Sequence, residues 1–251
     1  MRAFIIMVYR QIKRFSRAKS RVVGMVVNPL IWLIFFGVGW SGVFKDVRVF
    51  GGVNYLTYLA PGIFAMTIFN QSFISGVSVI WDREFGFLKE VLVAPASRKE
   101  TISGRIVGDS IVATVQGAII LFLTLLITEV RIPGILPTLG VGLLLAVAFS
   151  SFGVCLATRI QSMEGFQMIM AVLMLPIIFL SGAIYPINAM PWWMKLLAYI
   201  NPLTYAVDGA RSMLTDVDGV FPLSTDLSIL GFLALAFLGI AMFAFERSTL
   251  E

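Results

Sequence analysis

Two long uncharged runs flank a short, densely charged stretch, and this alternation constrains the fold more than any other feature of the sequence. Residues 49–81 contain no charged side chain, and neither do residues 110–128, whereas eight charged residues lie between positions 82 and 100. About 20 apolar residues suffice to cross the hydrocarbon core of a bilayer. The two runs therefore predict membrane-spanning helices, and the charged stretch predicts a connection that lies in water.

The charged stretch has a helical pattern of its own. Residues 82–94 contain no proline, and Phe85, Leu88 and Leu92 recur at the spacing of one helix face. Asp82 is a suitable cap, and a proline follows the stretch. The pattern predicts a short helix outside the bilayer, which is either a solvated connector or a docking helix for a soluble partner. The side chains available for docking are Asp82, Arg83, Glu84, Phe85, Phe87, Leu88, Lys89 and Glu90.

Composition agrees with a membrane protein. Hydrophobic residues make up 59% of the chain and charged residues only 13%, compared with about 25% charged in soluble domains. We therefore expect an all-α integral membrane protein with six transmembrane helices, formed by a single transmembrane domain over residues 1–251. The predicted spans are residues 22–44, 55–80, 103–128, 135–158, 165–184 and 227–246.

The N-terminal segment, residues 1–21, predicts an amphipathic interface helix. It carries seven basic residues and no acidic one. At 100° per residue, the arginines fall in one sector, and an apolar set falls in the opposite sector. Such a helix lies along a membrane surface, although the same residues also form a generic topogenic signal. The basic set includes Arg10, Arg14, Arg17 and Arg21, and the apolar set is Phe4, Val8, Ile12 and Phe15.

An aromatic-rich segment precedes the last predicted span. Residues 185–211 predict two short helices divided at Asn201-Pro202, because the uncharged run inside them is too short to cross a bilayer. Trp192, Trp193 and Tyr205 are typical of a membrane–water interface. The segment is either a pair of re-entrant external helices or an interfacial helix that never dips into the bilayer.

Basic residues predict the orientation. With six spans, 14 lysines and arginines lie on the side of the termini and of residues 82–94, and five lie on the other side. Basic residues favour the cytoplasmic side. We therefore expect a multi-pass protein of the cell membrane with both termini in the cytoplasm.

The sequence carries no catalytic constellation. It has no histidine, a single cysteine and no phosphate-binding G-x-x-x-x-G-K-[ST] loop. Asp109 is the carboxylate nearest to a mid-span position, and Arg105 is the ion-pair partner expected for it at helical spacing. Neutral polar residues within the spans either join helices by hydrogen bonds or line a path for an amphipathic substrate. The candidate path residues are Asn70, Gln71, Ser75 and Gln167.

Three stretches resemble the type-2 ABC exporter permeases, in particular the bacterial and archaeal branch of drug and lipo-oligosaccharide exporters. They are YLAPGI at residues 58–63, DREFGFLKEVLVAP at residues 82–95, and a third set before the last span. The third set comprises Pro191-Trp192, the NPLTY sequence at residues 201–205 and Arg211. The resemblance covers essentially the whole chain.

The resemblance implies a permease without an ATPase site of its own. It implies a dimer of permeases, expected to be a homodimer, bound to two cytoplasmic ATPase subunits that carry ATP and Mg²⁺. Residues 82–94 would be the coupling helix, and residues 185–211 would cap the exit. The substrate would be a drug, a lipid or a lipid-linked glycan. A self-contained channel or secondary carrier is the alternative, whereas an intramembrane enzyme lacks any catalytic set of residues.

Overall fold

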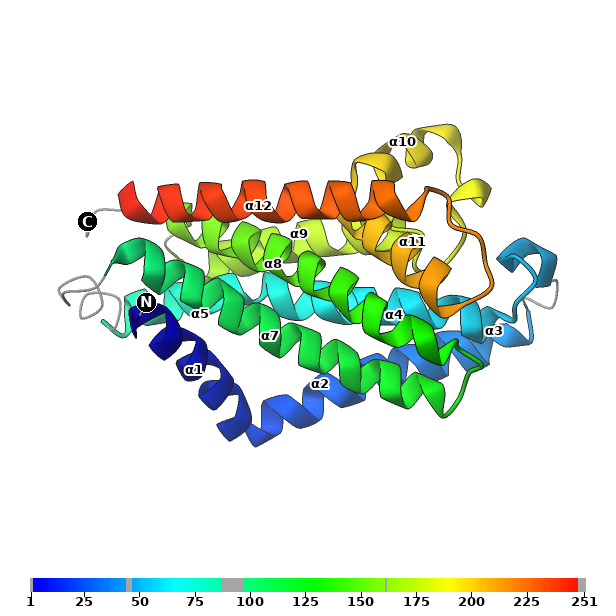
Figure 1. The fold of residues 1–251 in the computed structure, drawn as a ribbon, viewed down its shortest axis with the longest axis horizontal. Coiled ribbons are helices and arrows are strands. Elements are labelled where there is room, and N and C mark those ends of the chain that lie inside the picture. The colour runs from blue at the N-terminus through cyan, green and yellow to red at the C-terminus, as the bar shows by residue number, and fades with distance from the viewer. Residues whose placement is uncertain (1, 44–46, 87–96, 161, 248–251) are drawn as a thin grey trace.

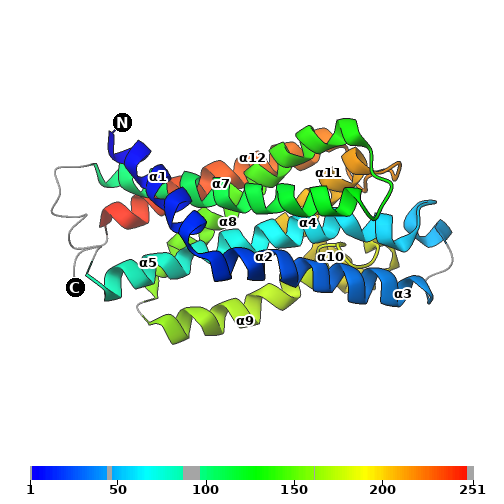
Figure 2. The same ribbon diagram turned by 90° about the horizontal axis from the view of Figure 1, so that it is seen from below.

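The computed structural model describes residues 2–43, 47–86, 97–160 and 162–247, and within these ranges the chain forms helices and no strand. Figures 1 and 2 show an elongated bundle in which most helices run along its length. The start of α1, the end of α5, the start of α7 and the end of α12 lie at one end, here called the termini end. The α helices are α1 (Arg2–Arg17), α2 (Lys19–Trp32), α3 (Gly39–Ser41), α4 (Tyr55–Phe73), α5 (Ser75–Glu84), α7 (Arg98–Leu125), α8 (Ile135–Arg159), α9 (Met163–Leu180), α10 (Trp192–Ile200), α11 (Pro202–Leu214) and α12 (Leu223–Arg247).

Five helical stretches of the described chain are long and apolar enough to cross a membrane. They confirm an all-α protein with several spans and correspond to five of the six predicted spans. The remaining apolar helix, Val26–Ser41, is shorter, so a sixth crossing stays a prediction. The five stretches are Arg48–Glu84, Arg98–Leu125, Ile132–Arg159, Met163–Leu180 and Leu223–Arg247.

The first apolar helix is irregular along its length. Pro29 lies inside α2, and a π-helix, η1 (Leu33–Val38), connects α2 to α3. A proline removes one backbone donor from the helical ladder, and π turns accommodate an altered register. Trp32, Phe36 and Trp40 nevertheless stack in succession, with ring centroids 4.8 and 6.0 Å apart. One aromatic face therefore continues through the irregular turn.

The next stretch is formed by α4 and α5, which meet at Ile74. The side chain of Asn54 caps α4 by accepting a hydrogen bond of 2.8 Å from the backbone N–H of Thr57. After Ile74, α5 continues to Glu84. The prediction that Asp82 caps a separate helix is therefore wrong: Asp82 lies in the last turn of α5. The predicted coupling helix falls largely on residues 87–96, which lie outside the described residues.

The predicted interface helix, α1, packs closely against α7. Gly104 of α7 faces the backbone of Phe4, and Gly108 faces Gln11, so that the two helices approach through small residues. Met7 and Gln11 are buried in this contact. The helix ends at Arg17, and Arg21 belongs to α2. Thus α1 packs on the bundle through a mixed polar and apolar face.

The segment before α12 forms the two predicted helices, α10 and α11. The side chain of Asn201 caps α11 and ties it to α9: its Oδ1 accepts a hydrogen bond from the N–H of Leu203 at 3.0 Å, and its Nδ2 donates to the carbonyl of Ile177 at 2.7 Å. Pro202 occupies the first turn of α11. Most of α11 is buried against α4, α8 and α12, whereas Trp192 and Trp193 of α10 are exposed.

We predict that Gly104→Ala loosens the contact between α1 and α7. A Cβ at this position would lie 2.5 Å from the backbone oxygen of Phe4, and overpacking typically costs about 1–3 kcal/mol. The free energy of unfolding should fall by that amount in a denaturant titration. Gly140→Ala is the matched control because nothing lies within 4 Å of its Cβ position. Equal stability of the two variants would contradict the close approach.

Candidate functional site

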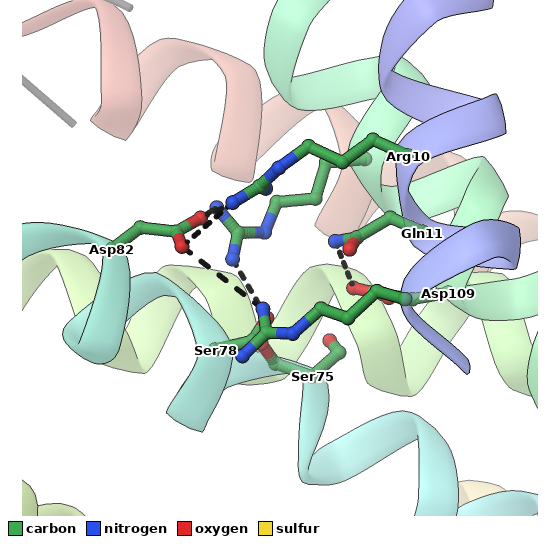
Figure 3. Close-up of polar contacts among 8 residues, drawn as sticks. Arg10, Gln11, Ser75, Ser78, Asp82 and Asp109 are labelled. Carbon is green, nitrogen blue, oxygen red and sulfur yellow. Dashed lines mark hydrogen bonds and ion pairs between the residues drawn. The ribbon is translucent and has the colours of Figure 1, made fainter. Parts of the chain in front are cut away.

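A shared carboxylate, Asp82, joins three helices at the termini end. Arg10 of α1 donates to both Asp82 oxygens, at 3.1 and 3.0 Å. Arg105 of α7 approaches Asp82 from the other side, with 2.8 Å between Nη1 and Oδ2. Figure 3 shows Arg10 and Asp82 facing one another across the gap between their helices. The last turn of α5 is thus tied to both α1 and α7.

The network continues into the bundle through hydroxyl groups. Arg105 also donates to Oγ of Ser78 at 2.7 Å, and Ser78 donates to the carbonyl of Ser75. Ser75 in turn donates to the carbonyl of Ser150 on α8 at 3.3 Å. Arg105 is only 3% exposed and Asp82 only 6%. Because both charges are buried, each depends on the other for compensation.

The predicted ion pair between Arg105 and Asp109 is not formed. Arg105 turns to Asp82, and Asp109 instead accepts a hydrogen bond of 3.3 Å from Nε2 of Gln11 on α1. Helical spacing favours the first pair, but on α5 Arg105 finds both a carboxylate, Asp82 at 2.8 Å, and a hydroxyl acceptor, Ser78 at 2.7 Å. Arg10 is likewise committed to Asp82, whereas the sequence placed it on a face turned toward lipid headgroups.

A cavity of about 520 Å³ lies beside this network. Its walls come from α1, α2, α4, α5, α7 and α9. One end is polar and carries Gln11, Arg14 and Asp109. Apolar side chains form much of the remaining wall: Phe15, Trp32, Ile63, Met66, Trp81, Val112, Met174 and Ile178. The cavity therefore offers an amphipathic surface of the size that small organic ligands occupy.

Three of the four candidate path residues line this cavity. They are Asn70, Gln71 and Ser75, and Oδ1 of Asn70 is buried without a hydrogen bond from any described residue. Gln167 does not line it: its side chain is exposed on α9. Sequence reasoning missed Gln11, because a lone glutamine on a basic helix carries no signal of its own.

The end of α5 presents an unusual apolar side chain to solvent. Phe85 follows the last helical residue and is 83% exposed, and Glu84 beside it is also exposed. Gly86 comes next with a φ of 78°, a conformation that turns the chain away from the helix. Phe87, Leu88, Lys89 and Glu90 lie outside the described residues. The part of the docking segment that is described therefore shows both a charged and an apolar group.

The opposite end of the bundle is fixed by a buried cation. Arg211 of α11 is stacked on the ring of Tyr58, with 3.7 Å to its centroid, and donates to the carbonyl of Gly182 at 2.9 Å. Tyr205 of α11 donates its hydroxyl to the carbonyl of Tyr199 in α10. These bonds hold α10 and α11 against α4 and the end of α9. The described residues contain no cluster of three or more metal-ligating side chains.

Comparison with known proteins identifies relatives over most of the chain. The model of the ABC-2 type transporter family matches residues 2–215. The transport permease named ycf38 of Cyanophora paradoxa is 28% identical, over 86% of this chain and 75% of the relative. The daunorubicin resistance ABC transporter permease protein DrrB1 of Streptomyces coeruleorubidus is 24% identical, over 93% and 82%. The inner membrane transport permease YadH of Escherichia coli K12 is 22% identical, over 91% and 88%.

We predict that Asp82→Asn destabilises the protein strongly. The substitution leaves Arg105 buried without its counter-charge, and breaking a buried ion pair from one side typically costs about 3–5 kcal/mol. Unfolding measurements on the purified variant should show a loss of that size.

Glu246→Gln is the matched control for this experiment. It breaks the exposed pair of 3.1 Å between Lys99 and Glu246, and such pairs contribute about 0–1 kcal/mol. A loss at Asp82 no larger than the loss at Glu246 would show that the Asp82 network does not hold the termini end together.

Proposed function

Because the chain belongs to the ABC-2 type transporter family, we propose that it is the membrane-spanning permease subunit of an ATP-driven exporter. The chain is a multi-pass membrane protein with several spans. In our proposal a separate cytoplasmic ATPase subunit binds ATP and Mg²⁺, and this chain supplies the path. Two permease copies, in a homodimer, pair with two ATPase subunits. Both termini lie in the cytoplasm, which places the termini end against the ATPases.

The observation that carries this proposal is that one helix, α5, both lines the cavity and ends at the exposed residues Glu84 and Phe85. Ser75 and Trp81 of α5 line the cavity, and Phe85 projects into solvent just beyond its end. A displacement of the docking segment would therefore move a wall of the cavity. The buried pair of Asp82 with Arg105 would pass the same displacement to α7. These contacts support the assignment of residues 82–94 as the coupling helix.

The cavity supports a hydrophobic or amphipathic substrate. Its apolar wall would accept a hydrocarbon or aromatic body, and its polar end would accept a headgroup. A drug, a lipid or a lipid-linked glycan has this character, and one relative bears the name of a drug-resistance permease. The proposed direction is out of the cytoplasm, past α10 and α11, which would form re-entrant helices at the exit.

A self-contained channel or secondary carrier remains the second candidate, and Asp109 at the polar end of the cavity is the feature that favours it. Carboxylates within spans often serve ion coupling. The two candidates differ in their need for a partner. Isolation of this chain with a stoichiometric ATPase supports the exporter, and transport by the lone chain without ATP supports the carrier.

We predict that Phe85→Ala and Glu84→Lys each uncouple ATP hydrolysis from transport while the protein remains folded. Removal of the exposed ring deletes the apolar contact with the ATPase, and the charge reversal introduces repulsion there. Transport per ATP hydrolysed should fall at least tenfold in proteoliposomes. Phe122→Ala is the control, since Phe122 is an equally large exposed side chain on α7. Normal transport by both Phe85→Ala and Glu84→Lys would refute the coupling role.

We predict that the polar wall of the cavity controls substrate binding. Asn70→Ala removes a buried acceptor that faces the cavity, and substrate affinity should fall roughly five- to thirtyfold, the cost of about 1–2 kcal/mol for a lost hydrogen bond. The affinity is obtained from the substrate concentration that half-maximally stimulates the ATPase activity of the complex. Gln167→Ala should behave as wild type because its side chain lies outside the cavity. A larger loss of substrate affinity in Gln167→Ala than in Asn70→Ala would instead indicate that the substrate path runs along α9.

A further inference from the structure

Two carboxylates are buried together at the corner between α11 and α12. Asp208 belongs to the middle of α11 and is 3% exposed, and Asp226 lies in the first turn of α12 and is fully buried. The helices pack against each other here, and Figure 1 shows this corner at the end of the bundle opposite the termini end. A Cβ placed on Gly209 would lie 3.6 Å from Oδ2 of Asp226. The side chain of Asp226 thus points at the residue next to Asp208.

The two carboxylates differ in how they are satisfied. Asp208 accepts hydrogen bonds from the backbone N–H groups of Val220 and Phe221, at 2.9 and 2.8 Å. It thereby draws the loop between α11 and α12 back over the helix. Neither oxygen of Asp226 accepts a hydrogen bond from any described residue. No lysine or arginine of the described chain forms an ion pair with Asp226, since Arg211 is turned toward Tyr58.

Local donors favour the charged form of each side chain, and burial opposes it. Two amide hydrogen bonds stabilise the charge on Asp208, and the N-terminal turn of α12 stabilises the charge on Asp226. The two buried carboxylates nevertheless repel each other, and burial of an uncompensated ion is costly. Asp218, exposed in the same loop, makes the local potential more negative, whereas Asp216 is paired with Arg131 at 3.3 Å. A bound cation would therefore stabilise this corner, because no described lysine or arginine pairs with Asp226.

We propose that Asp208 and Asp226 form a binding site for a divalent cation of the hard, oxygen-seeking class, with Ca²⁺ the best-suited ion. Two carboxylates match the charge of such an ion. Ca²⁺ also tolerates irregular coordination completed by backbone carbonyls and water, whereas Mg²⁺ demands near-octahedral geometry. The bound ion would clamp the start of α12 to α11. The site goes beyond the proposed transport function and does not depend on it.

The test uses the full-length protein, purified in detergent and treated with a chelator. Its thermal unfolding midpoint is measured against Ca²⁺ and Mg²⁺ at constant ionic strength. At a hundredfold excess over the dissociation constant, Ca²⁺ should raise the midpoint by roughly 5–10 °C, and Mg²⁺ should raise it less. Terbium, which replaces Ca²⁺, should show luminescence sensitised by the nearby Tyr205, which interacts electrostatically with Asp226.

Asp226→Asn keeps the shape of the side chain and removes its charge. It should abolish the Ca²⁺ shift and reduce terbium luminescence to background, and Asp208→Asn should weaken Ca²⁺ binding at least tenfold. Asp218→Asn, at an exposed carboxylate of the same loop, is the control and should leave both signals intact.

Three results would overturn the site. The first is a wild-type midpoint that responds to pH but not to Ca²⁺, which would mean that a proton neutralises the pair. The second is an unchanged Ca²⁺ shift in Asp226→Asn. The third is loss of the signals in Asp218→Asn, which would move binding to the loop surface. None of these measurements depends on transport activity. A negative result would therefore argue against the cation site and not against the proposed function.

Discussion

The termini end of the structure depends on one carboxylate, because Asp82 is the group that α1, α5 and α7 have in common. A guanidinium as deeply buried as that of Arg105 is tolerable only beside a negative charge, and Asp82 supplies it while also receiving two hydrogen bonds from Arg10. The small residues Gly104 and Gly108 make this possible, since they let α1 approach α7 closely enough for Arg10 to reach α5. Packing and charge compensation therefore support each other: larger side chains on α7 would move α1 outward and leave Asp82 with fewer partners.

The opposite end is fixed by a different kind of contact. Arg211 forms no ion pair with a carboxylate of the described residues and instead rests on the face of Tyr58 and on backbone carbonyls. A ring face and carbonyl oxygens offer partial negative charge without a second ion. Such a contact suits a short helix such as α11, which is held by the bundle rather than by its own length. Each end is thus stabilised by a buried arginine, Arg105 at the termini end and Arg211 at the opposite end. The cavity lies beside the network of Arg105.

The sequence predicted the spans well because long apolar runs leave few alternatives to a helix in a bilayer. Residues 135–158 and α8 differ by one residue, and the division at Asn201 between α10 and α11 was recognised from Asn-Pro alone. Prediction from the sequence failed where a side chain contacts residues far away in the chain. Asp82 was predicted to be a helix cap because it is an aspartate at the start of a helical pattern, but its partner Arg10 is 72 residues away. Arg105 was assigned to Asp109 by helical spacing, which describes a single helix and contains no information on α1 packed against it. Gln167 was included for its polarity, and only the rotation of α9 shows that it faces outward.

The distribution of contacts also determines which walls of the cavity can move. Walls from α4, α5 and α7 belong to the core, where Phe64, Phe69 and Phe73 are fully buried, and α5 and α7 are further joined by the Asp82 network. The walls from α2 and α9 are different. Only 17% of the most apolar part of α9 is buried within the chain, and α2 contains both Pro29 and the transition to a π-helix. Displacement of α2 or α9 breaks few buried contacts, whereas displacement of α7 must separate buried charges. A rearrangement that opens the cavity therefore costs least along α2 and α9, whereas α5 and α7, joined through Asp82, would have to move together as one unit.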